Sequence, residues 1–175
     1  MLRLLSFALL MFISAALALA ADLPVRKPGL WQLKLALEEF ATLPPQLAEH
    51  CIDAATDKLM DVTGSNMQQA MCSKPDVQKV GSTFVVDSVC KMGPFAMNSH
   101  AVISGDLNSA YTVKVTSKQV GEPVAGIPAS SSMTIEAKWV GACRADQKPG
   151  DMIMAGRKVN VRDMQNMLPG AGQKK

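Results

Sequence analysis

The sequence predicts a mainly β protein: an antiparallel meander curled into an open or partly closed barrel, with short helical segments near the N-terminal third and two disulfides. Three observations lead to this fold class. Apolar and polar residues alternate over several segments, residues that favour turns separate those segments, and no stretch between them is long enough for a crossover helix. A composition of 48% hydrophobic and 19% charged residues is typical of a packed globular domain.

An export signal is predicted for the first 20 of the 175 residues. Arg3 provides a basic start, Leu4 to Leu19 is apolar apart from two serines, and Ala18 to Ala20 has the small-x-small pattern of a cleavage site. A retained membrane anchor is disfavoured because the apolar run is only marginally long enough for a bilayer. We therefore expect cleavage after Ala20, no stable membrane insertion afterwards, and a periplasmic protein. We also expect a single β-rich domain over 21–168 and a disordered tail over 169–175.

The first strand is expected from Trp31 to Glu38, where Trp31, Leu33, Leu35 and Leu37 point to one face of the sheet. Two prolines, Pro44 and Pro45, then break the chain.

Short helical segments follow the break. Asp53 or Thr56 is expected to cap a helix that runs toward Met60, and Ser65 to cap a second turn that ends near Met71.

Five further strands are predicted: Lys74 to Val80, Thr83 to Met92, Ala96 to Gly105, Ala110 to Val120, and Ser131 to Val140. Short turns join them, so they form a meander whose apolar face needs a partner. The sheet is expected to curl, or to pack against the segment from Pro44 to Met71. A small terminal hairpin is expected from Asp151 to Met154 and from Lys158 to Val161, followed by one helical turn from Asp163 to Leu168.

An even number of cysteines in an exported chain is most simply two disulfides. Three pairings of Cys51, Cys72, Cys90 and Cys143 are possible, and hairpin geometry favours one of them. A three-residue loop at 80–82 places Lys79 opposite Thr83, and counting outward in step brings Cys72 opposite Cys90. Cys51 then pairs with Cys143. Pro75 or a bulge would shift this register by one residue.

Neither the composition nor any known catalytic motif in the sequence indicates an enzyme class. A formal charge of +3 and 5% aromatic residues argue against a dedicated nucleic-acid binder. No G-x-S-x-G and no phosphate-loop pattern occurs in the sequence. His50 beside Cys51 is a weak nucleophile pair, because sequence neighbours rarely face each other and export favours oxidation of the thiol. His100 belongs to an exposed strand face. No catalytic residue and no cofactor are assigned.

Methionine is the one unusual component, with 12 residues in the chain. Soft thioethers can hold Cu(I), and the weak metal candidates are Met152, Met154 and His100. The other close pairs are Met67 with Met71 and Met164 with Met167. Because the pairs are scattered, the favoured interpretation is that methionine fills irregular cores and contacts apolar partners. No metal site is assigned.

Several landmarks resemble those of a known family. They are the segment Lys27 to Trp31 just after a signal, Cys51 followed by Ile52, the hairpin from Cys72 to Cys90, Trp139 followed by Cys143, and the segment Lys148 to Met152. This pattern resembles the small exported bacterial proteins of the domain-of-unknown-function 3617 family. The resemblance implies a periplasmic, mainly β protein with no established activity, and it transfers no catalytic residue.

The expected function is a non-catalytic binding or envelope-accessory role. If the sheet curls, its mouth can admit an apolar small ligand, and an envelope protein is the other expected partner. One alternative is a periplasmic copper-handling protein that uses Met and His, and another is a hydrolase whose site the sequence does not reveal. Ligand-binding residues and oligomeric state stay unassigned.

Overall fold

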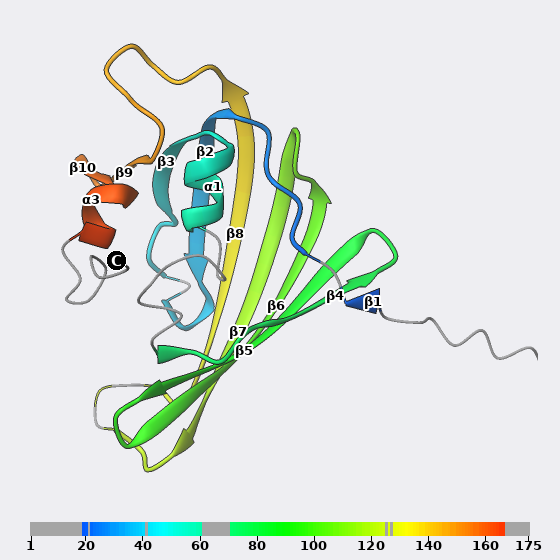
Figure 1. Cartoon of the computed structure of the whole chain (residues 1–175). Coiled ribbons are helices and arrows are strands. Elements are labelled where there is room, and N and C mark those ends of the chain that lie inside the picture. Colours follow the sequence, from blue (N-terminus) through cyan, green and yellow to red (C-terminus); the bar gives the residue numbers. More distant parts are fainter. Residues whose placement is uncertain are drawn as a thin grey trace, which may run out of the picture.

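The computed structural model describes residues 19–20, 22–40, 42–60, 71–124, 126 and 128–166. Ten strands form one sheet in the order β1-β4-β5-β6-β7-β8-β2-β3-β9-β10. The strands are β1 (Leu19–Ala20), β2 (Gly29–Leu37), β3 (Gln46–Ile52), β4 (Asp76–Val80), β5 (Thr83–Met92), β6 (Phe95–Asp106), β7 (Ala110–Gly121), β8 (Ser130–Gly141), β9 (Asp151–Met154) and β10 (Arg157–Asn160). Every pairing is antiparallel, and the sheet curls without closing, which confirms the predicted fold class (Figure 1).

The meander from β5 to β8 agrees with its predicted bounds to within one residue at each end. Its turns explain this agreement. Gly81 and Gly93 adopt positive φ angles of 62° and 65° in two-residue turns, a conformation that costs glycine little. Between β6 and β7, the Asp106 carboxylate accepts hydrogen bonds from the Asn108 backbone N–H (2.9 Å) and the Ser109 hydroxyl (2.8 Å).

Strand β3 is the main correction to the predicted order of elements. After the two prolines the chain does not go straight into a helix, but returns antiparallel to β2 and pairs with it from Gln46 to Ile52. The strand was missed because it lacks a regular apolar alternation: Leu47 is exposed, whereas Ala48, Cys51 and Ile52 are buried. A strand between two others is stabilised by pairing and packing with its neighbours, and the β-propensity of its own residues does not show these interactions.

The helical elements are short: η1 (Glu38–Phe40), α1 (Ala54–Met60) and α3 (Val161–Asn166). Asp53 caps α1 as predicted. Its Oδ1 accepts a hydrogen bond from the Thr56 N–H (2.7 Å), and the Thr56 hydroxyl accepts one from the Asp53 N–H (3.0 Å). The second helical turn, expected from Ser65, lies almost entirely outside the described residues.

The terminal hairpin forms as predicted, shifted by one residue in its second strand. The following helix starts two residues earlier than expected, at Val161.

The core lies on the sheet face that α1 covers. Figure 1 shows α1 across β2 and β3, so the segment after the prolines supplies both a strand and a covering helix. The buried cluster consists of Trp31, Leu33, Ala48, Ile52, Tyr111 and Ala137. Trp31 is fully buried, and its ring centroid lies 5.3 Å from that of Tyr111. The core therefore lies on the four neighbouring strands β7, β8, β2 and β3.

The disulfides join Cys51 to Cys143 and Cys72 to Cys90, the pairing that the hairpin argument favours. The register behind that argument is wrong, however. The turn has two residues, with Val80 opposite Thr83, and β4 stays in this register as far as Asp76 opposite Asp87. Cys72 lies four residues before Asp76, whereas Cys90 lies only three residues after Asp87, and the two cysteines are nevertheless opposite each other. The first segment therefore has one extra residue at 73–75, which includes Pro75. This extra residue compensates for the turn, which is one residue shorter than predicted, so the predicted cysteine pair still forms.

Two further observations concern the chain ends. No helix in the part of the chain that is described is long and apolar enough to cross a membrane. Strand β1 consists of the last two residues of the expected export signal and pairs with β4. Cleavage after Ala20 would therefore leave β4 at this edge of the sheet.

Candidate functional site

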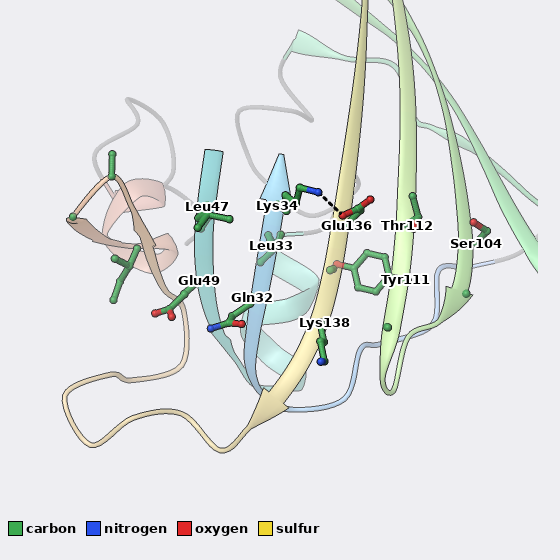
Figure 2. Close-up of a pocket in the computed structure, with 17 residues that line it drawn as sticks. Gln32, Leu33, Lys34, Leu47, Glu49, Ser104, Tyr111, Thr112, Glu136 and Lys138 are labelled. Carbon is green, nitrogen blue, oxygen red and sulfur yellow. Dashed lines mark hydrogen bonds and ion pairs between the residues drawn. The ribbon is translucent and has the colours of Figure 1, made fainter. Parts of the chain in front are cut away.

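A groove with a volume of about 760 Å³ crosses the sheet face opposite the core (Figure 2). Side chains alternate between the two faces of a strand, so the residues next to the core residues point into this groove. Two rows of the strand register line it. One row contains Leu47, Lys34, Glu136, Thr112 and Ser104, and the other contains Ile153, Glu49, Gln32, Lys138 and Ala110. The groove therefore spans β9 to β6, on the order of 24 Å at the usual spacing between strands.

Small residues keep the two ends of the groove open. Gly105 and Ala110 lie at the β6–β7 end, and Ala155 and Gly156 form the turn between β9 and β10 at the other. The side chains of the core residues Leu33 and Ala137 point to the opposite face of the sheet. These two residues therefore contribute to the groove only at its floor, where the strands themselves run. Leu47, with 72% of its surface exposed, is a large apolar side chain open to this face.

Most charges in the groove are already paired. Lys34 Nζ lies 3.2 Å from Glu136 Oε2 across β2 and β8, and Glu49 is paired with Arg144 from the loop after β8. The first pair is half-exposed at both ends, so its contribution to stability is about 1 kcal/mol or less. Lys138 has no ion-pair partner among the residues that the structure describes. Its neighbours across the strands are Gln32 and Ala110.

A second cluster, on the core face, holds the segment before β2 in place. Arg26 Nη2 lies 2.6 Å from Asp57 Oδ1 on α1, and Arg26 Nη1 donates a hydrogen bond to the Tyr111 hydroxyl (2.7 Å). Burial alone would lower the pKa of Arg26, but the neighbouring Tyr111 and Asp57 raise it overall. Burial also raises the pKa of Tyr111. With its charge compensated, this cluster acts as an anchor between β7, α1 and the N-terminal segment.

His50 lies beside this anchor and does not form a nucleophile pair with Cys51. Cys51 is in a disulfide, so its thiol is not available. His50 Nδ1 is buried and has no hydrogen-bond partner among the described residues. Burial, with Arg26 nearby, lowers the pKa of His50 to about 3, so the ring is neutral at ordinary pH.

The metal candidates are not brought together. His100 is on β6, where its Nδ1 lies 2.8 Å from Asp87 Oδ1 on β5. Met152 and Met154 are on β9, and four strands separate β9 from β6 in the sheet. Across the described ranges, no group of three or more His, Cys, Asp or Glu residues could hold a metal ion. Two other methionines of the candidate pairs, Met67 and Met167, lie outside those ranges.

None of the groove residues was singled out from the sequence. The available signal was the polar alternation of Gln32 and Lys34 in one strand and Glu136 and Lys138 in another. These polar residues indicate a shared groove only when β2 is known to pair with β8, which lies about a hundred residues further along the chain.

Fold and groove together define a small, disulfide-linked, open antiparallel sheet protein with a cross-strand groove on one face. The chain belongs to the DUF3617 family, described as "Protein of unknown function (DUF3617)", whose family model matches residues 26–143. The match begins at the anchor residue Arg26 and ends at Cys143. It includes both disulfides and β2 to β8, whereas the hairpin of β9 and β10 lies beyond it. No curated protein and no solved structure matches the chain.

Proposed function

We propose that this protein is a periplasmic, non-catalytic binding protein that holds a small, largely apolar ligand in the cross-strand groove. The observation that carries the proposal is the groove itself, with its volume of about 760 Å³. Small-molecule sites usually measure a few hundred to a thousand cubic ångströms and combine apolar walls with a few polar groups. Leu47, Ile153 and Ala110 supply apolar surface here, and Gln32 and Lys138 supply polar groups.

The sequence and the crosslinks support the proposed compartment. Two disulfides are typical of proteins that fold in oxidising compartments, and the first 20 residues have the pattern of a cleavable export signal. N-terminal sequencing of the protein from a periplasmic extract should begin at Ala21. A chain that starts at Met1 and stays with the inner membrane would contradict this part of the proposal.

The groove should lose its ligand when a bulky side chain fills it. Thr112 lines the groove on β7, directly opposite Glu136 on β8, so Thr112→Phe should fill this part of the groove and weaken binding of the neutral dye N-phenyl-1-naphthylamine by about tenfold or more, as expected from a steric block. Dye fluorescence measures the dissociation constant, and native mass spectrometry of the wild-type protein would identify a carried ligand.

The matched control is Thr116→Phe. Thr116 is on the same strand and the same face but does not line the groove, so this variant should bind the dye as the wild type does. Equal affinities for the two variants, or no dye binding by the wild type, would contradict the proposal.

A further inference from the structure

We infer that the ligand is an amphiphile with one anionic group, which Lys138 and Gln32 receive, and an apolar body that lies on Leu47 and Ile153. This inference rests on the proposed function and names the class of ligand. It comes from the distribution of charge and apolar surface along the groove, because the polar pair lies on the central strands β8 and β2 whereas the large apolar side chains lie toward β9.

The charge argument begins with the four charged side chains that line the groove. Lys34 and Glu136 pair with each other, and Glu49 is paired with Arg144. Lys138 remains as the one lining cation without a carboxylate partner in the described part of the chain. A groove with a single uncompensated lysine complements a ligand with one negative charge.

Gln32 adds a second donor next to this lysine. It lies directly opposite Lys138 on β2, and Figure 2 shows the two side chains next to each other on these neighbouring strands, in the lower part of the view. An ammonium group and an amide N–H₂ on neighbouring strands can each donate to one oxygen of a carboxylate or phosphate.

The apolar surface lies to one side of this polar pair. Leu47 is on β3 and Ile153 on β9, two and three strands from β8, or roughly 10 to 15 Å from Lys138. Ala155 and Gly156, beyond them, leave this end unobstructed. A ligand that satisfies both regions therefore has its anionic group at one end and an extended apolar chain at the other.

The test compares amphiphiles with the same chain and different head groups, each below its critical micelle concentration. Decanoate, decyl phosphate, decyltrimethylammonium and decyl glucoside compete with the neutral dye for the wild-type protein. We expect one or both anions to bind about tenfold more tightly than the cation, because a charge-assisted hydrogen bond is gained. A preference for decanoate indicates a fatty acid, and a preference for decyl phosphate indicates a phosphate head group.

Lys138→Met retains the apolar stem and removes the charge. This variant should lose the preference for anions and keep the affinity for decyl glucoside. Lys114→Met is the matched control, since Lys114 is on the same face of β7 outside the groove, and it should retain the preference. Equal binding of all head groups, or an unchanged preference in Lys138→Met, overturns the inference while the proposed function stands. Failure of the dye and of every amphiphile to bind overturns the proposed function itself.

Discussion

At the scale of single residues, Gly29 explains why the chain enters the sheet with Pro-Gly-Leu-Trp. Its φ angle is +128°, and a Cβ atom there would lie 2.3 Å from the Gly141 carbonyl oxygen and 2.7 Å from Trp139 Nε1. The same indole donates a hydrogen bond to the Pro28 carbonyl (3.0 Å), and Lys27 Nζ lies 3.5 Å from the centre of its ring. A side chain at position 29 would therefore disrupt the contact between the start of β2 and the end of β8.

Gly29→Ala should lower the free energy of unfolding by about 3 kcal/mol, because it combines backbone strain with a clash against backbone. Gly81→Ala is the control: its φ is also positive, but a Cβ atom would meet nothing within 4 Å, so the expected cost is about 1 kcal/mol. Urea denaturation with intact disulfides measures both values. Equal costs would show that the close approach to Gly141 and Trp139 is unimportant.

His50 gives the protein a specific response to acid. In the folded protein its pKa is about 3, whereas in the unfolded chain it has its ordinary value of 6.5. Between these values the unfolded state binds one more proton, so stability falls as the pH decreases from 6.5 toward 3. The contribution of this one residue is about 1.4 kcal/mol per pH unit.

His50→Leu should therefore flatten the decline in unfolding free energy between pH 6.5 and pH 4, measured by urea denaturation at each pH. Replacing the ring also removes a buried nitrogen that has no partner among the described residues, which is close to neutral or stabilising near pH 7. If His50→Leu keeps the wild-type slope, burial of the neutral ring is not its cause.

At the scale of elements, the hairpin of β9 and β10 is attached through a buried carboxylate. Asp151 Oδ1 accepts a hydrogen bond from Asn160 Nδ2 (2.8 Å), and its Oδ2 accepts one from the Lys148 N–H (3.0 Å). Burial alone would raise the pKa of Asp151, but the hydrogen bonds from Asn160 and Lys148 lower it overall. Because Ile153 and Ala155 belong to this hairpin, the same contacts hold one wall of the groove.

Asn160→Ala should loosen this hairpin by about 1 to 3 kcal/mol, because it leaves a buried carboxylate oxygen without a donor. Hydrogen exchange of the amides in 151–160 should accelerate, whereas exchange in β6 and β7 should change little. Lys158→Ala is the control, since Lys158 makes an exposed ion pair with Asp146 that contributes about 1 kcal/mol or less. Uniform acceleration over the whole sheet would contradict a local role.

Strand β3 shows which elements the sequence could predict. The strands of the meander have regular alternation and turn residues at both ends, so local signals were sufficient for them. β3 lacks the alternation and has turn residues, Pro44 and Pro45, at its first end only. It is a strand because β2 pairs along one edge and β9 along the other. One of these partner strands precedes β3 in the sequence and the other follows it, and the seven residues of β3 do not by themselves indicate either partner.

At the scale of the whole molecule, the two disulfides constrain very different lengths of chain. Cys51 and Cys143 are 92 residues apart, and Cys72 and Cys90 are 18 apart. The long bridge connects β3, one of the core strands, to the loop after β8, whereas the short bridge closes a hairpin that is already paired.

Replacing both members of the long bridge with serine should therefore cost about 4 to 5 kcal/mol, against about 3 kcal/mol for the short bridge, in the chain-entropy description. Urea denaturation of the two double variants measures the difference. A larger cost for Cys72 and Cys90 would contradict the chain-entropy argument. Non-reducing peptide mapping of the wild type should recover the two bridged peptides.

Local patterns in the sequence were sufficient to predict the fold class, the lengths of the meander strands and which side chains of those strands share a face. These properties depend on alternation and turn residues that lie close together in the chain. The partners of β2, the one-residue offset at 73–75 and the groove are visible only in the folded structure. Alternation assigns a side chain to a face but does not specify which distant strand lies beside it. The pairing of β2 with β8, which brings Lys34 beside Glu136 and Gln32 beside Lys138, depends on packing of the whole sheet around Trp31.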